Sequence, residues 1–126
     1  MKRFWLGICI LLILFSSGLV VSISFQRIHK SISENLVDAA DAAMAENWEQ
    51  AFHLARSAIS RWERYHTLTA AFADHTPMDE MDALFVQLPI FAQKREDPHF
   101  AATCLELSFL AKAMAESHRL SWWNLL

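Results

Sequence analysis

The sequence predicts an all-α protein in which an N-terminal transmembrane helix is followed by a small antiparallel bundle of three to four helices. Only two Gly and three Pro occur in 126 residues, although sheets and turn-rich folds need these residues at their bends. The residues from 4 to 25 carry no charged side chain. Beyond them, apolar residues recur at helical spacing among Ala, Leu and Glu, which are good helix formers.

The predicted membrane helix covers residues 4–25, between a basic tail of residues 1–3 and a helical extramembrane domain of residues 26–126. At 1.5 Å per residue these 22 residues give about 33 Å of helix, enough to cross a bilayer core. The lipid bilayer is therefore the first predicted partner. A signal peptide cleaved after Gly18 or Ser22 is the alternative, but the apolar run is longer than the usual signal core.

The positive charges on the two sides of this segment are equal in number, with Lys2 and Arg3 before it and Arg27 and Lys30 after it. The charge count alone therefore does not decide the orientation. A three-residue tail with a free amine favours retention of the N-terminus in the cytoplasm. We therefore expect a signal anchor in the cell membrane with an extracytoplasmic C-terminal domain.

Helical spacing resumes directly after the anchor, with apolar residues every fourth position at Ile28, Ile32, Leu36, Ala40 and Met44. Because residues 19–76 contain neither Gly nor Pro, the membrane helix is expected to continue into this stretch as a rigid stalk. The partner of this apolar stripe is either the rest of the domain or a second copy of the chain.

A second helix is expected to start at Asn47, which with Gln50 has the form of a reciprocal N-cap, and to carry an apolar face as far as Phe72. Thr76 and Pro77 then provide a cap and a first-turn proline for a third helix, which Pro89 should kink or end early.

Asp97 and Pro98 repeat the cap and proline pattern and predict a fourth helix to about Leu120. The apolar tail, residues 121–126, is expected to pack back onto the bundle, with the membrane interface or a partner surface as alternatives. The predicted core consists of Trp48, Trp62, Phe72, Leu84, Leu88, Leu107 and Leu110.

Composition argues against several functions. Beyond the anchor nine basic residues stand against fourteen acidic ones, which disfavours nucleic-acid binding. Cys9 lies in the apolar segment and Cys104 in a predicted helix, where a buried apolar role is expected. No Gly-rich phosphate loop, nucleophile motif or facing pair of carboxylates is recognisable, so we predict that the chain is not an enzyme and has no cofactor.

The six His residues are scattered and form no known metal-binding motif. The strongest metal candidates are His75, Asp79 and Glu116, with His118 as an alternative in the last helix. The break at Pro77 separates His75 from the helix that bears Asp79, so a capping or hydrogen-bonding role for His75 is favoured over metal ligation.

Several features occur in a characteristic order: the basic N-terminus, the anchor, Asn47-Trp48-Glu49-Gln50-Ala51, Trp62, His75-x-x-x-Asp79-Glu80-Met81, Glu116 and Asn124-Leu125. In this order the chain resembles the domain of unknown function 4363 family, small single-anchor proteins found mainly in Gram-positive bacteria. Pro89 and the doubled Trp122-Trp123 depart from the pattern. The resemblance implies the same layout over nearly the whole chain and assigns no activity, substrate or cofactor.

The sequence is therefore interpreted as a membrane-anchored helical protein with a structural or protein-interaction role at the bacterial cell surface. Its partner is an unidentified protein or a second copy of itself. The alternative is a membrane-tethered sensor of a metal or small ligand centred on His75, Asp79 and Glu116.

Overall fold

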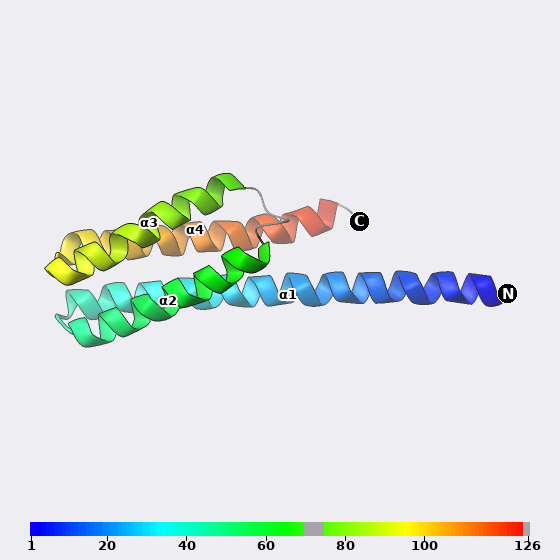
Figure 1. Cartoon of the computed structure of the whole chain (residues 1–126), viewed down its shortest axis with the longest axis horizontal. Coiled ribbons are helices and arrows are strands. Elements are labelled where there is room, and N and C mark those ends of the chain that lie inside the picture. The colour runs from blue at the N-terminus through cyan, green and yellow to red at the C-terminus, as the bar shows by residue number, and fades with distance from the viewer. Residues whose placement is uncertain (70–74, 125–126) are drawn as a thin grey trace.

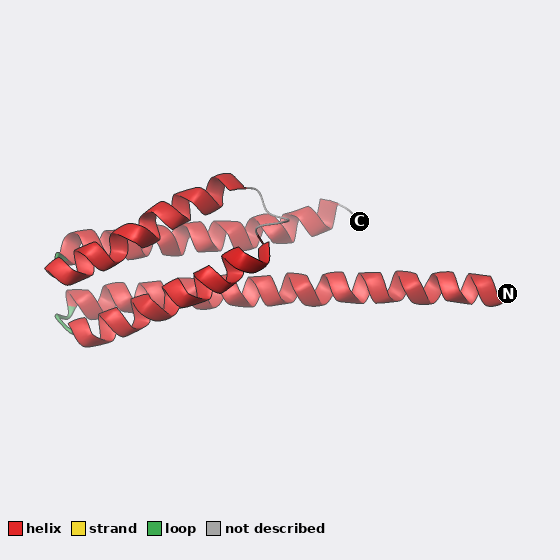
Figure 2. Ribbon diagram, in the orientation of Figure 1, coloured by secondary structure: helices red, strands yellow, loops and turns green. Residues whose placement is uncertain are grey.

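The computed structural model of the chain describes residues 1–69 and 75–124, without the side chains of His75, His118, Leu120 and residues 121–124. These residues form four helices: α1 (Lys2–Met44), α2 (Trp48–Thr69), α3 (His75–Lys94) and α4 (Asp97–Asn124). The helices run alternately up and down, and the N-terminal half of α1 protrudes from one end of the bundle (Figure 1). The described chain contains helices and short connections (Figure 2), which confirms the all-α prediction.

The first helix is a single unit of 43 residues, as the lack of Gly and Pro after Gly18 predicted. At 1.5 Å per residue it is about 65 Å long. Its two halves differ in surroundings: Leu11, Ile13 and Leu14 are about two-thirds exposed, whereas Ile32 and Leu36 are fully buried. Within the described residues α1 is the one helix long and apolar enough to cross a membrane, and 6% of its most apolar window is buried.

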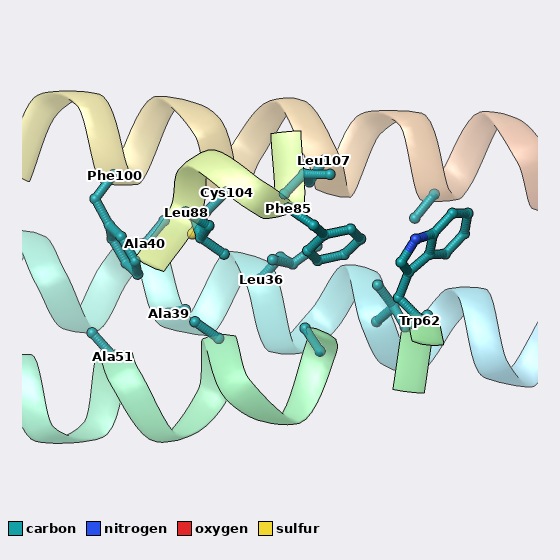
Figure 3. Close-up of a cluster of buried hydrophobic side chains, with 14 of the residues drawn as sticks. Leu36, Ala39, Ala40, Ala51, Trp62, Phe85, Leu88, Phe100, Cys104 and Leu107 are labelled. Carbon is teal, nitrogen blue, oxygen red and sulfur yellow. The ribbon is translucent and has the colours of Figure 1, made fainter. Parts of the chain in front are cut away.

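The core forms where α2 and α4 pack along the C-terminal half of α1, while α3 packs mainly on α4. Small side chains dominate the contact between α1 and α2, so these two backbones approach closely. Larger side chains from α3 and α4 fill the other side (Figure 3). The buried alanines of α1 and α2 in the core cluster include Ala39, Ala40, Ala43, Ala51, Ala55 and Ala58.

Most of the predicted core is confirmed: Trp48, Trp62, Leu88 and Leu107 are buried. Leu84 and Leu110 lie at the edge of the core and are only partly buried, and Phe72 falls outside the described residues. Met44 was predicted on the buried stripe of α1, which is wrong, because it is 62% exposed. At the end of α1 the contact passes instead to Ala42 and Ala43.

Two hydrogen bonds between polar side chains fix how far the helices slide along each other. The hydroxyls of Ser33 and Ser108 lie 2.7 Å apart in the buried contact between α1 and α4. The amide of Asn35 donates to the Ser57 hydroxyl across α1 and α2, at 3.2 Å. Because a buried polar group without a partner costs free energy, these pairs favour one register of the bundle.

The ends of α1 and α3 are closed in the same way. After α1, the backbone N–H of Glu46 donates to the Ala43 carbonyl and that of Asn47 to the Ala42 carbonyl, both at 2.9 Å. After α3, the N–H groups of Arg95 and Glu96 bond in the same pattern. Both ends are Schellman motifs, which require a left-handed residue. Glu46 (φ 60°) and Arg95 (φ 52°) occupy these positions without being glycine.

The predicted cap of α2 is confirmed. The Gln50 backbone N–H donates to the Asn47 side-chain oxygen at 3.4 Å, and the Asn47 side-chain amide donates to the Gln50 side-chain oxygen at 3.0 Å. These contacts satisfy one of the free donors at the start of the helix and hold the two side chains together. Asn47 therefore both ends the first connection and starts α2.

The predicted starts of α3 and α4 need small corrections. The third helix begins at His75, so Thr76 lies inside the first turn and is not its cap. The fourth begins at Asp97, and the Phe100 N–H donates to the Glu96 carbonyl at 2.9 Å, which places Glu96 at the cap. Asp97 lies instead in the first turn, where the helix dipole favours a carboxylate.

Two helices are longer than predicted. An early end of α3 at Pro89 is wrong, because the helix continues to Lys94. Pro89 is exposed, and burial of Leu88 and Ala92 holds the last turn against the core. The fourth helix passes Leu120 and ends at Asn124. The predicted packing of the tail side chains lies outside the described residues.

Replacing Glu46 by Gly should stabilise the bundle, because a left-handed conformation costs a non-glycine residue about 1 kcal/mol. For a bundle of about 100 residues this corresponds to a rise in melting temperature of about 4 °C or more. Thermal unfolding followed by circular dichroism measures it. As a control, Glu63→Gly, at an exposed position in the middle of α2, should destabilise the bundle by about 1 kcal/mol. An unchanged or lower melting temperature for Glu46→Gly contradicts the assigned cap.

Candidate functional site

The structure does not test the predicted metal candidate. Asp79 is exposed near the start of α3, and Glu116 is exposed on α4. The side chain of His75 lies outside the described residues. Among the side chains that are described, no group of three His, Cys, Asp or Glu residues is arranged to hold a metal ion. Ligation by His75, Asp79 and Glu116 thus stays a prediction.

A polar cluster joins α2 and α3 through Trp62, His66 and Asp82. The indole N–H of Trp62 donates to one carboxylate oxygen of Asp82. The other carboxylate oxygen lies 3.1 Å from Nε2 of His66. Trp62 is 2% exposed, whereas the His66 and Asp82 side chains are each 40% exposed. Asp82 therefore accepts from a buried donor while it stays in contact with solvent.

Helical spacing creates this cluster. Trp62 and His66 are four residues apart, so they share one face of α2, and Trp62 also stacks against Phe85 of α3 with ring centroids 5.8 Å apart. Asp82 lies three residues before Phe85 and so meets both side chains. The apolar spacing predicted Trp62 in the core but gave no indication of Asp82. A buried indole needs an acceptor, and this requirement was the signal that pointed to a nearby carboxylate.

A second polar site is a cleft of about 610 Å³ between α1 and α4. Residues spaced by four along each helix provide its charges: Lys30, Glu34 and Asp38 on α1, and Lys112 and Glu116 on α4. Lys30 Nζ and Glu34 Oε1 are 3.8 Å apart. Two cations and three carboxylates therefore line one concave surface, which suits a ligand that carries both charges. We call this surface the mixed-charge cleft. The spacing of charges along α1 alone does not reveal that Lys112 lies opposite them.

A third concave surface is the groove between α2 and α3, with a volume of about 440 Å³. Its walls are mostly apolar, and Arg56 and Gln93 provide its polar side chains. The groove lies between two helices that contact each other little, because α2 packs mainly on α1 and α3 packs mainly on α4. The remaining lining residues are Phe52, Ala55, Ile59, Leu88, Pro89 and Ala92.

The groups with shifted pKa values are buried and held in their neutral form. Burial raises the pKa of the Cys104 thiol to about 12, and this side chain is fully buried as predicted. Burial also raises the pKa of Tyr65, against a smaller lowering by its hydrogen bond with Thr69. Because the thiolate is the reactive form of cysteine, Cys104 is not suited to nucleophilic chemistry near neutral pH.

The fold defines the class of protein: a small all-α bundle that carries a long apolar N-terminal helix. The chain belongs to the family described as domain of unknown function DUF4363, whose model matches residues 19–125. This confirms the resemblance found in the sequence. Comparisons with curated proteins and with solved structures found no match.

Replacing Asp82 by Leu should destabilise the bundle by about 1 to 3 kcal/mol, because the buried indole N–H of Trp62 then has no acceptor. Asp82→Asn keeps an acceptor oxygen and should cost less. Urea unfolding followed by tryptophan fluorescence and circular dichroism measures both variants. Asp79→Leu, on an exposed position one turn earlier, is the matched control and should change stability by no more than about 0.5 kcal/mol. Equal effects of Asp82→Leu and Asp79→Leu contradict the role given to Asp82.

Proposed function

We propose that this chain is a membrane-anchored, non-catalytic protein whose bundle lies at the surface of a bacterial membrane and acts through protein contacts. The observation that supports the anchor is the contrast within α1, whose most apolar window is only 6% buried. Large apolar side chains left exposed over so many turns need a nonaqueous neighbour, and a bilayer provides one.

The bundle begins close to where this apolar segment ends. Phe25 is partly buried and contacts Tyr65 of α2 with ring centroids 5.4 Å apart, and His29 one turn later is fully buried. The apolar helix and the bundle thus share one rigid helix with no flexible linker between them. A protein built in this way holds its bundle at a fixed height and orientation on the membrane.

Protein contacts are supported by exposed apolar pairs on the bundle. Val86 and Ile90 are four residues apart on α3, and they are 69% and 49% exposed. Leu105 and Phe109 have the same spacing on α4, with 48% and 71% exposed. Each pair forms a short apolar ridge, because residues four apart lie on the same side of a helix. These two ridges are the proposed contact surface for a protein partner or a second copy.

Leu14→Lys should reduce membrane integration, because a lysine near the centre of a spanning helix costs about 2.5 to 3.5 kcal/mol. Carbonate extraction of cell membranes, with detection of the full chain, measures integration. Val86→Lys is the matched control: it adds the same charge to an exposed apolar position of the bundle and should leave the chain in the membrane. A mature chain that starts after Gly18 or Ser22 contradicts the uncleaved anchor.

Orientation is tested in the same cells by reporters fused after Leu126. We propose an extracytoplasmic bundle, so alkaline phosphatase should be active there and a cytoplasmic fluorescent reporter should be dark. The opposite pair of results places the bundle in the cytoplasm and leaves the anchor itself unaffected.

A photo-crosslinking amino acid at Phe109 or Val86 should capture a protein in intact cells, because these positions lie on the apolar ridges. The same amino acid at Glu63, an exposed position on α2, is the control and should capture far less. Mass spectrometry of the crosslinked band distinguishes a second copy from another protein. Absence of a product at both ridge positions contradicts the proposed contact surface.

A further inference from the structure

The exposed apolar pair on α4 and the groove between α2 and α3 lie on different sides of the bundle. Leu105 and Phe109 are 48% and 71% exposed, on the side of α4 away from the buried Leu107. The groove opens between α2 and α3, whereas α4 packs mainly on α1 and α3. The pair therefore cannot enter the groove of its own chain, and the groove it can enter belongs to another molecule.

The groove continues into the second exposed apolar pair, Val86 and Ile90 of α3. Val86 precedes Pro89 by three residues. Ile90 precedes Gln93 by the same spacing, so both apolar residues lie on the side of α3 that lines the groove. The groove and this pair thus form one apolar surface, with Arg56 on its α2 wall.

Two hydrogen bonds give the heights of α2 and α4 along α1. Both helices run antiparallel to α1 (Figure 1). The Ser33 and Ser108 hydroxyls are 2.7 Å apart, and the Asn35 side-chain nitrogen is 3.2 Å from the Ser57 hydroxyl. Ser108 is therefore level with Ser33, and Ser57 is level with Asn35. Each residue before these positions on α2 or α4 lies about 1.5 Å farther from the N-terminal end of α1.

On this scale the apolar pair of α4 and the groove have the same height. Leu105 and Phe109 cover roughly the heights of residues 32–36 of α1. The groove residues of α2, from Phe52 to Ile59, cover roughly the heights of residues 33–40. The two surfaces overlap along the axis, so one can enter the other without a shift of either molecule along α1.

Opposite charges lie at matching heights beside the two surfaces. Glu106 is two residues before Ser108, which makes it level with Asn35. Arg56 is one residue before Ser57, so it lies only about 2 Å farther along α1. Both side chains are exposed, and neither forms an ion pair within the part of the chain that the structure describes. Glu106 beside the apolar pair thus complements Arg56 on the wall of the groove.

Copies of the chain that share one membrane also share this scale, a step that rests on the proposed anchoring of α1. Copies whose α1 helices cross the same bilayer in the same direction differ by a rotation about the membrane normal. Such a rotation brings the apolar pair of one copy to the groove of the next and leaves both at their matching heights. Because the two surfaces differ, the contact is heterologous and leads to rings or rows.

We propose that copies of this chain associate head to tail in the membrane. Leu105 and Phe109 of one copy lie in the groove between α2 and α3 of the next, and Glu106 pairs with Arg56 across the contact. The partner of the two apolar ridges is thus a second copy of the chain. Burial of Phe109 provides most of the affinity, because aromatic side chains bury a large apolar area. The charged pair mainly sets the orientation.

Crosslinking between two differently tagged copies of the full chain tests this contact. Both copies carry Cys9→Ser; one also carries Glu106→Cys and the other Arg56→Cys. In cell membranes treated with a short bis-maleimide, a product with both tags should form. Cys104 should stay unreacted, because burial raises the pKa of its thiol to about 12 and the thiolate is the reactive form.

Two controls use the same reagent. Glu106→Cys paired with Glu63→Cys tests the height of the contact, because Glu63 is two turns or about 10 Å closer to the N-terminal end of α1 than Arg56. Glu106→Cys in both copies tests a symmetric contact between two α4 helices. Each control should give far less product than the pair of Glu106→Cys and Arg56→Cys.

Substitutions at the contact test its chemistry. Energy transfer between labelled full chains in lipid vesicles measures the association. Phe109→Ala should weaken it by about tenfold or more, the loss expected when one large apolar side chain is no longer buried. Glu106→Arg and Arg56→Glu should each weaken it, and the two reversals together should restore it. All three positions are exposed, so the circular dichroism of each variant should match that of the unmodified chain.

The inference is overturned by several results. These are a product from two Glu106→Cys copies alone, an equal yield with Glu63→Cys, and the absence of any product with both tags in membranes that contain the chain. A double charge reversal that fails to restore association also overturns it. A chain absent from the membrane fraction contradicts the anchor as well, so the two failures are distinguishable.

Discussion

One uninterrupted helix has to meet two different surroundings along a single axis. The N-terminal half of α1 exposes Leu, Ile and Phe around its circumference, while its C-terminal half is the central element of the bundle. Partial burial begins at Gly18 and Ser22, and His29 is the first fully buried residue, without a break in the backbone. Since α2 and α4 both pack on this second half, the position of every other element depends on α1 staying helical through the boundary.

Close packing on α1 requires small side chains. Ala39, Ala40 and Ala43 of α1 and three alanines of α2 are buried in the same core cluster, so small side chains lie where α1 meets its neighbours. The cost of small residues is that they bury little apolar area each. Aromatic residues compensate at the ends of the contact: Trp48 and Phe100 close one end with ring centroids 5.5 Å apart, and Tyr65 meets Phe25 and His29 at the other. Alanine surfaces are too uniform to define how far one helix slides along another. The hydrogen bonds of Ser33 with Ser108 and of Asn35 with Ser57 favour one register.

The sequence predicted the features that follow from local chemistry. The continuity of α1, the cap at Asn47 and the burial of Cys104 depend on residues near each other in the chain, and all three are confirmed. The ends of α1 and α3 were harder to define, because Glu46 and Arg95 adopt left-handed conformations that usually signal glycine. Pro89 led to the opposite error, a helix predicted to end too early. Burial of its neighbours keeps α3 helical beyond it.

Features that join distant segments were not predictable in the same way. Asp82 was missed because its partners Trp62 and His66 lie on another helix, and nothing in the spacing of α3 alone marks this carboxylate. The mixed-charge cleft depends likewise on the register between α1 and α4, which the contact between Ser33 and Ser108 fixes.

The same register sets the position of the cleft along α1. Because α1 continues without a hinge from the apolar segment into the wall of the cleft, the height of Lys30 above Phe25 is set by helix geometry alone. Lys112 acquires the same height only through the packing of α4 on α1. A loosened contact between these helices would therefore separate the two lysines while leaving α1 itself unchanged. The packing of α4 on α1 thus fixes which charges face each other across the cleft.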